Sequence, residues 1–145
     1  NPAVNNILSA YTRRARKEQI GVSLDVRVGR ELTIPNIDLV TILANAYENA
    51  IYACMEVKKQ AKGRECLIHL MMKQKKNKLV IYCSNTCRLE TELIHGQPKP
   101  EFTGGIGVSS IIKTAENFGG VYDFKNDNGV FVFRLIMNMP SPKEA

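Results

Sequence analysis

The spacing of apolar positions divides the chain into eight predicted elements. Apolar residues recur at helical spacing up to about residue 19, and Asn1 followed by Pro2 is typical of a helix start. The same spacing returns over about 37–58 and over 107–118. Alternation with period two, or a short apolar run between turn residues, predicts strands. These strands are expected at 22–28, 65–73, 78–84, 121–125 and 129–137.

The segments between these elements complete the predicted fold. Asn36 is expected to cap the long helix, and turns at 74–77 and 126–129 each join two consecutive strands into a hairpin. Residues 86–105 have no apolar period and contain several glycines and prolines, so they form a long loop, which is usually functional or disordered. We therefore expect an α+β fold, a two-layer sandwich with three helices on one face of a mixed, mainly antiparallel sheet.

Length and composition indicate one globular domain over residues 1–145. The hydrophobic fraction is 44%, and no apolar run approaches the ~20 residues of a membrane span. The chain begins with Asn1 rather than Met, so we expect a domain cut from a larger protein. The four cysteines form no CxxC pair, which disfavours a zinc site and favours buried thiols in the cytoplasm.

The net charge of +6 raises the possibility of nucleic-acid binding. Two of the three clusters of basic residues lie where a helix end and a hairpin turn are expected, and no zinc-finger spacing or RNA-binding aromatic strand accompanies them. Solvated charge is the simpler interpretation, and a nucleic-acid binder stays as an alternative. The clusters are Arg13, Arg14, Arg16 and Lys17; Lys58, Lys59, Lys62 and Arg64; and Lys73, Lys75, Lys76 and Lys78.

The long helix carries polar residues of an unusual kind. On a helical projection Asn45, Glu48 and Asn49 fall opposite the apolar face, with no Lys or Arg among them. Asn45 and Asn49 are one turn apart, so their amide oxygens can converge on one point. Mg²⁺ prefers oxygen ligands and commonly binds together with nucleotide phosphates. A metal–nucleotide site and a simple exposed polar face both fit this helix.

A glycine-rich segment precedes the last helix. Gly104, Gly105 and Gly107 lie at its start, where glycines allow close approach of a phosphate and free N–H groups attract anions. No GxxxxGK[ST] motif occurs, so a P-loop is excluded, and no strand stands just before the glycines, as a dinucleotide fingerprint would need.

Taken together, these motifs resemble the Bergerat-type (GHKL) ATP-binding domain of gyrase, Hsp90 chaperones, MutL and sensor histidine kinases. The stretch "LANAYENAIYAC" resembles the N box of that family, and "GGIGVSSIIKTAENFGG" resembles its last glycine box. Two further stretches are similar to the peptide quorum-sensing branch of the kinases: the entry segment "NPAVNNILSAYTRRARKEQIGVSLDV" and the last strand "GVFVFRLIMNMP".

The resemblance implies a role for each motif residue. Asn49 matches the Mg²⁺-binding asparagine, with Asn45 as its partner one turn earlier. Glu48 stands where the ATPase branch has its water-activating carboxylate, although in a kinase it could instead orient the γ-phosphate. Gly105 and Gly107, with Gly104 before them, match the glycines that hold the end of the ATP lid against the phosphates. The lid itself is expected at about 86–104.

Two positions depart from the family pattern. Most members contact adenine through the Asp of a DxGxG motif, which this chain lacks; Asn85, as is common in the quorum-sensing branch, is the candidate in its place. An amide oxygen can still accept a hydrogen bond from the adenine amino group. Many kinases also carry a Lys one turn after the Mg²⁺-binding asparagine, where this chain has Tyr52, and Arg88 or Lys99 could supply the missing charge.

The resemblance implies the catalytic domain of a two-component sensor histidine kinase. Such a domain binds Mg–ATP and transfers the γ-phosphoryl to a histidine on a separate dimerisation domain. A response regulator would then be the next partner. The parent would be a membrane-anchored homodimer with this domain in the cytoplasm. The alternative is a degenerate nucleotide-binding or interaction module without phosphotransfer.

Overall fold

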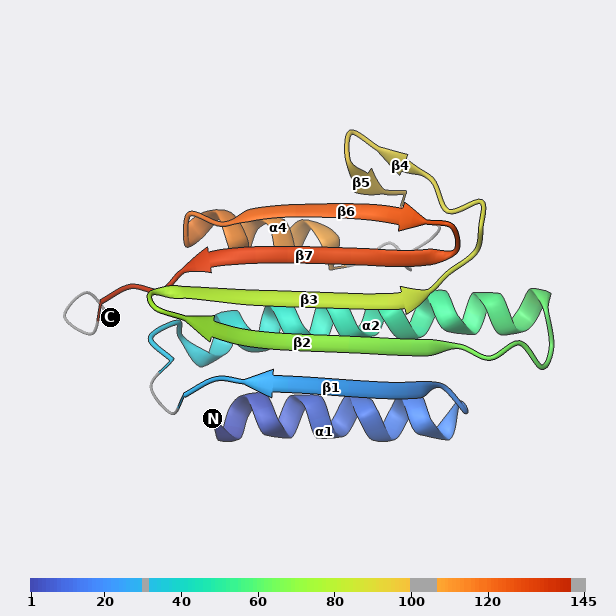
Figure 1. Ribbon diagram of the computed structural model, residues 1–145, viewed down its shortest axis with the longest axis horizontal. Helices are drawn as coiled ribbons and strands as arrows, with labels where there is room; N and C mark the ends of the chain where they lie inside the picture. Colours follow the sequence, from blue (N-terminus) through green and yellow to red (C-terminus); the bar gives the residue numbers. More distant parts are fainter. Residues whose placement is uncertain (30–31, 100–106, 142–145) are drawn as a thin grey trace.

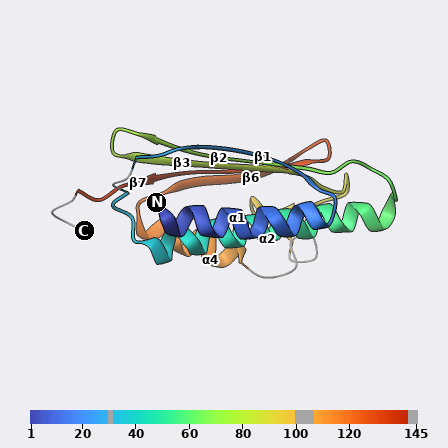
Figure 2. The same ribbon diagram turned by 90° about the horizontal axis from the view of Figure 1, so that it is seen from below.

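The computed structural model describes residues 1–29, 32–99 and 107–141. In these residues five strands form one sheet, and three helices cover one of its faces (Figure 1). Seen from below, the helices and the sheet are two separate layers (Figure 2). The expected α+β sandwich is therefore confirmed.

The three helices begin and end close to the predicted positions. They are α1 (Pro2–Lys17), α2 (Asn36–Gln60) and α4 (Val108–Asn117). Asn1 caps α1 as expected, because its side-chain oxygen accepts hydrogen bonds from the backbone N–H groups of Ala3 and Val4. The expected Asn36 cap is wrong. The carbonyl of Pro35 accepts the first helical bonds, and the Asn36 side chain accepts a hydrogen bond from Asn1 instead.

The sheet has the strand order β1-β2-β3-β7-β6. Only the β1–β2 pair is parallel, because α2 forms the crossover between these two strands, and the other three pairs are antiparallel. The strands are β1 (Gly21–Arg27), β2 (Leu67–Lys75), β3 (Lys78–Thr86), β6 (Val121–Asp127) and β7 (Val130–Asn138).

The two long hairpins have tighter turns than the sequence suggested. Strands β2 and β3 extend to Lys75 and Lys78, so only two residues join them. Between β6 and β7 the turn residues Asn128 and Gly129 both have positive φ, of 50° and 89°. An Asn-Gly pair is the preferred sequence for a turn that requires positive φ at both positions.

The segment expected to be a structureless loop contains a short hairpin. Strands β4 (Leu93–Ile94) and β5 (Gln97–Pro98) pair in antiparallel fashion across His95 and Gly96, whose φ angles are 52° and 76°. The turn chemistry of a His-Gly pair was not recognised in the sequence because no apolar alternation surrounds it. This hairpin lies beside one end of β6 (Figure 1).

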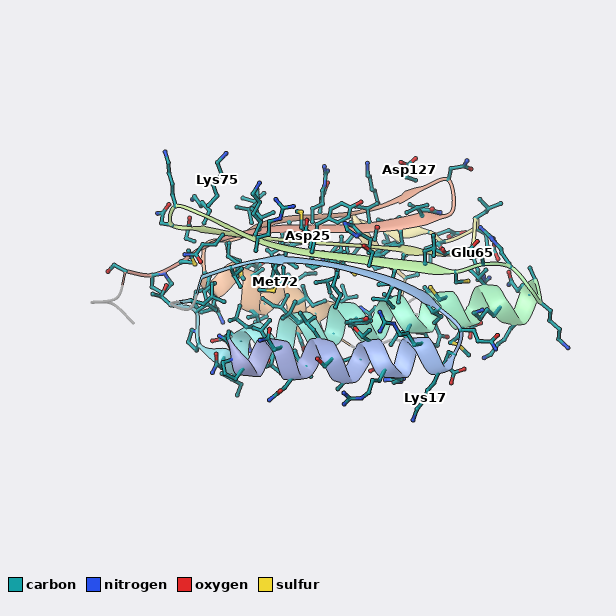
Figure 3. All side chains as sticks on the ribbon, turned by 60° about the horizontal axis from the view of Figure 1, so that its bottom comes forward. Lys17, Asp25, Glu65, Met72, Lys75 and Asp127 are labelled. Carbon is teal, nitrogen blue, oxygen red and sulfur yellow. The ribbon has the colours of Figure 1, made fainter. Side chains whose placement is uncertain are left out.

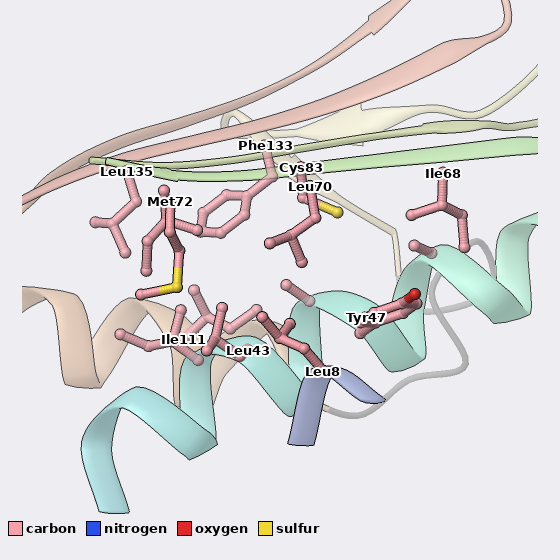
Figure 4. Close-up of a cluster of buried hydrophobic side chains, with 14 of the residues drawn as sticks. Leu8, Leu43, Tyr47, Ile68, Leu70, Met72, Cys83, Ile111, Phe133 and Leu135 are labelled. Atoms are coloured by element: carbon pink, nitrogen blue, oxygen red, sulfur yellow. The ribbon is translucent and has the colours of Figure 1, made fainter. Parts of the chain in front are cut away.

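The hydrophobic core lies between the sheet and the helices. Leu70, Met72 and Phe133 point from the strands toward Leu43 and Ile111 on the helices (Figure 4). The opposite face of the sheet carries polar side chains such as those of Lys75 and Asp127 (Figure 3). A polar residue on the inner face of a strand therefore points into the layer between the sheet and the helices.

Candidate functional site

A narrow pocket opens in the core layer between α2, α4 and the inner face of the sheet. Its volume of about 10 Å³ is enough for about one water molecule. Aromatic rings form one wall, where Phe124 stacks on Phe133 with ring centroids 5.1 Å apart and on Phe131 at 6.0 Å. The lining residues are Ala46, Asn49, Cys83, Asn85, Ile111, Phe124, Phe131 and Phe133.

Asn85 is a polar residue on the inner face of β3. Strand β3 continues to Thr86, so Asn85 is not a turn residue but the next inward position after Cys83. Its side chain is 4% exposed, and its Nδ2 donates a hydrogen bond to the backbone carbonyl of Thr86 at 3.0 Å. Among the described residues no hydrogen bond is found to the amide oxygen. This arrangement leaves Asn85 as a hydrogen-bond acceptor at the pocket.

Asn49 lines the same pocket from α2. The helical projection placed it opposite the core, which is wrong, because the residue is only 9% exposed and lies among apolar groups. The projection assumed one buried face, whereas α2 packs against α1, α4 and the sheet together. Asn49 therefore places a polar amide on the wall of an otherwise largely apolar pocket.

Asn45 lies one turn before Asn49 and directly against the start of α4. Its Nδ2 donates to the backbone carbonyl of Thr41 at 2.8 Å. A Cβ built on Gly107 would lie 2.4 Å from the Asn45 Oδ1, so only glycine fits there. Gly107 also has a φ of 96° as the N-cap of α4. The structure thus brings Asn45 against Gly107, with Asn49 one helical turn away, while Gly104 and Gly105 lie outside the described residues.

Glu48 is not part of this group. Its side chain is directed to α1, where its Oε2 lies 2.7 Å from Nη1 of Arg14. The hydrogen bond from the Arg14 guanidinium lowers the pKa of the Glu48 carboxyl. One residue of helix turns a side chain by about 100°, which separates Glu48 from Asn49 in direction. The resemblance left Glu48 open as a water-activating carboxylate or as a group that orients the γ-phosphate, and in this structure its carboxylate is paired with Arg14.

The first part of the proposed lid is anchored. The Asn126 side chain on β6 donates to the carbonyls of Leu89 and Thr91 at 3.0 and 3.1 Å, and the Cys87 N–H bonds to the carbonyl of Gly129. Cys87 and Thr91 are buried. The sequence predicted a long loop with little to anchor it, and for residues 87–91 that expectation is wrong.

The two candidate cations on the same segment have acidic neighbours. Nε of Arg88 lies 2.6 Å from the Glu90 carboxylate, and Lys99 forms an ion pair with Glu92. Both pairs lie within the segment itself. Neither pair is part of the wall of the pocket.

A comparison with protein-family models identifies the family of the chain. The sequence model of the GHKL domain matches residues 34–138, which include α2, the pocket and the start of α4. The chain belongs to the GHKL domain family. None of the curated proteins compared with this GHKL domain matches it.

Solved structures with the same fold include the catalytic domain of a histidine kinase. The catalytic domain of histidine kinase ThkA, in a nucleotide-free form, superposes with a TM-score of 0.72 at 19% identity, over 100% of this GHKL domain and 95% of that chain. Acinetobacter baumannii histidine kinase AdeS gives 0.70 at 12% identity, covering 97% and 64% of the two chains. Full-length ShkA in complex with AMPPNP gives 0.68 at 12% identity, covering 97% and 30%. At these identities the likeness establishes the fold.

Sequence reasoning missed most of the pocket wall of the GHKL domain. Cys83 could have been found, since it stands two positions before Asn85 and therefore on the same face of the strand. Burial raises the pKa of the Cys83 thiol to about 12, so the pocket wall carries a neutral thiol there. All four cysteines are buried and free. The phenylalanines come from β6 and β7, which the sequence predicted as strands without their order in the sheet.

Within the described part of the GHKL domain, no helix is both long enough and apolar enough to cross a membrane.

Proposed function

We propose that this GHKL domain binds Mg–ATP in the pocket between α2, α4 and β3 and transfers the γ-phosphoryl to a histidine on a separate dimerisation domain. The observation that carries the proposal is that Asn49 and Asn85 both line one otherwise largely apolar pocket. Ligand pockets are typically apolar with a few polar groups that fix orientation. Two amides on facing walls match that description.

Asn85 is the residue that we assign to the base. Its Nδ2 is engaged by Thr86, so its oxygen is oriented to accept the adenine amino group as a carboxylate would. The pocket has room for only about one water molecule, so a purine enters only if lining side chains turn aside. The rings of Phe131 and Phe124 would then lie against the base.

Asn49 and Asn45 are the residues that we assign to the metal. Amide oxygens suit the hard Mg²⁺ ion, which usually binds with nucleotide phosphates. When bound, Mg²⁺ would neutralise charge on the transferring phosphoryl group, and catalysis would rest on positioning. The N-terminus of α4 at Gly107 would present backbone N–H groups to the phosphates, with Gly104 and Gly105 before it.

The phosphoacceptor is expected on another domain. His69 lies within β2, half-buried with its ring 5.9 Å from that of Tyr82, and His95 occupies the turn of the β4–β5 hairpin. Neither lies on a helix. A response regulator would be the downstream partner. We propose a membrane-anchored homodimeric parent with this domain in the cytoplasm, of the quorum-sensing kinase branch, because of the entry and closing segments quoted above.

The lid is proposed for a shorter segment than the sequence suggested. Residues 87–91 are fixed by Asn126 and are therefore excluded from it. The proposal for the remainder is that Mg–ATP increases protection from hydrogen exchange between residue 92 and Gly104. Equal protection with and without Mg–ATP would mean that this segment is no lid.

The decisive experiment mixes the domain with a separately produced dimerisation domain and γ-labelled ATP. Transfer of label to the histidine supports the kinase. Binding of Mg–ATP without transfer supports the degenerate module, which the absent DxGxG motif and Tyr52 favour. A salt-dependent mobility shift on DNA, unaffected by ATP, would support the nucleic-acid alternative that the charge of +6 suggests.

A further inference from the structure

Helix α1 is joined to α2 by a buried polar contact. The hydroxyls of Thr12 and Tyr47 are 2.7 Å apart, and both side chains are buried, at 6% and 0% exposure. The Tyr11 ring stacks on the Tyr47 ring with centroids 5.4 Å apart. Because a buried hydroxyl is costly without its partner, this contact fixes one relative position of the two helices.

An ion pair extends the same contact toward solvent. Arg14 binds Glu48 at 2.7 Å and also lies over the Tyr11 ring, 5.9 Å from its centroid. An exposed pair adds little to stability, but two partners hold this guanidinium in place. We call the set of Tyr11, Thr12, Arg14, Tyr47 and Glu48 the α1–α2 clamp.

The clamp holds α2 at the residues between the two asparagines. Tyr47 and Glu48 lie between Asn45 and Asn49 in the chain, so any rotation of this turn of α2 moves both amides. This turn of α2 has little room to rotate toward α4, because the Asn45 side chain already fills the space beside Gly107 that a Cβ would occupy. Packed elements of this kind change between discrete arrangements rather than deforming continuously.

We propose that the α1–α2 clamp positions Asn45 and Asn49 for the metal–phosphate end of the nucleotide, with Arg14 and Glu48 as positioning residues. The proposal rests on the proposed function. Asn85, which belongs to β3, is not held by the clamp. The clamp therefore acts on the metal-dependent part of ATP affinity and leaves the contact with the base unchanged. A change in the position of α1 would be transmitted to the metal site in the same way.

Charge reversal tests the clamp. In Arg14→Glu two carboxylates oppose each other, and we expect Mg–ATP affinity to fall about three- to tenfold while ATP affinity in EDTA stays unchanged. The doubly reversed protein, Arg14→Glu with Glu48→Arg, should recover the affinity. Arg134→Glu is the matched control, since Arg134 pairs with Asp123 on the outer face of the sheet. The two ion pairs are almost equally exposed. The side chains of Arg14 and Glu48 are 52% and 45% exposed, and those of Arg134 and Asp123 are 54% and 46% exposed.

The outcomes separate the two proposals. No Mg–ATP binding by the unaltered domain would overturn the proposed function itself. If the unaltered domain binds Mg–ATP, then an Arg14→Glu affinity equal to that of Arg134→Glu would overturn the clamp. A loss of equal size with and without Mg²⁺, or a doubly reversed protein no better than Arg14→Glu, would also overturn it. Circular dichroism on each variant verifies that the fold is retained.

Discussion

Helix α2 has two polar sides that look alike in sequence and differ in their surroundings. Asn49 is 9% exposed at the wall of a pocket, whereas the side chain of the preceding residue, Glu48, is 45% exposed and bound to Arg14. One side places the Asn49 amide on the wall of an apolar pocket. The other provides a carboxylate to a neighbouring helix. The role of a polar residue on this helix is therefore decided by the element that packs against it.

The close approach on the pocket side gives the largest expected effect. Gly107→Ala places a Cβ against Asn45 and adds backbone strain at a φ of 96°. Gly63→Ala is the control, with a φ of 86° and no atom within 4 Å of the added Cβ. We expect the control to lose about 1–2 kcal/mol of unfolding free energy. Gly107→Ala should lose about 1–3 kcal/mol more, measured by urea unfolding. Equal losses would show that the contact with Asn45 is unimportant.

The second prediction concerns the base-side wall of the pocket. Asn85→Ala should weaken ATP binding by about 1–3 kcal/mol, the cost of losing the partner of a buried polar group. Ser84→Ala is the matched control, because its side chain lies on the opposite face of β3. Calorimetric titration with ATP and with GTP provides the measurement. Unchanged affinity for both nucleotides in Asn85→Ala would mean that Asn85 does not read the base.

The third prediction tests the anchored segment beside the pocket. Asn126→Ala removes two hydrogen bonds to residues 89 and 91 and those that its oxygen accepts from Cys87 and Gly129, so the opening free energy of residues 87–91 should fall by about 1–2 kcal/mol. Hydrogen exchange measures this directly, with the exposed neighbour Lys125→Ala as control. In the unaltered domain the same residues should exchange equally with and without Mg–ATP. If Mg–ATP instead increased the protection of residues 87–91, these residues would be part of the lid.

The smallest effect is expected on the α1 side. Because Arg14 lowers the pKa of Glu48 in the folded protein, Glu48 stabilises the fold above its ordinary value of 4.5 and loses this contribution as the pH falls. Glu48→Gln should therefore lose less stability on acidification than the unaltered protein. The difference should be only about 0.2–0.5 kcal/mol, since the pair is half exposed. Parallel acid-unfolding curves for the two proteins would contradict this prediction.

The periodicity of the chain predicted the order of the main elements because each long element buries one face. It failed on α2 because that helix has neighbours on three sides, and a projection with one buried face cannot represent them. The asparagine pair was recognised by residue type and spacing, and the inward direction of Asn49 was not. The anchoring of residues 87–91 had no local signal, since Asn126 lies 35 residues or more further along the chain.

The central claim is that Asn49 holds Mg²⁺ for ATP at the pocket. The most direct measurement is the ratio of ATP affinities with Mg²⁺ and with EDTA, compared between the unaltered domain and Asn49→Ala. Because Asn49 is buried, the variant is measured below its own unfolding temperature rather than assumed to fold equally well. We predict that Mg²⁺ strengthens ATP binding to the unaltered domain and has no such effect on Asn49→Ala. The same Mg²⁺-dependent gain in both proteins would contradict the account.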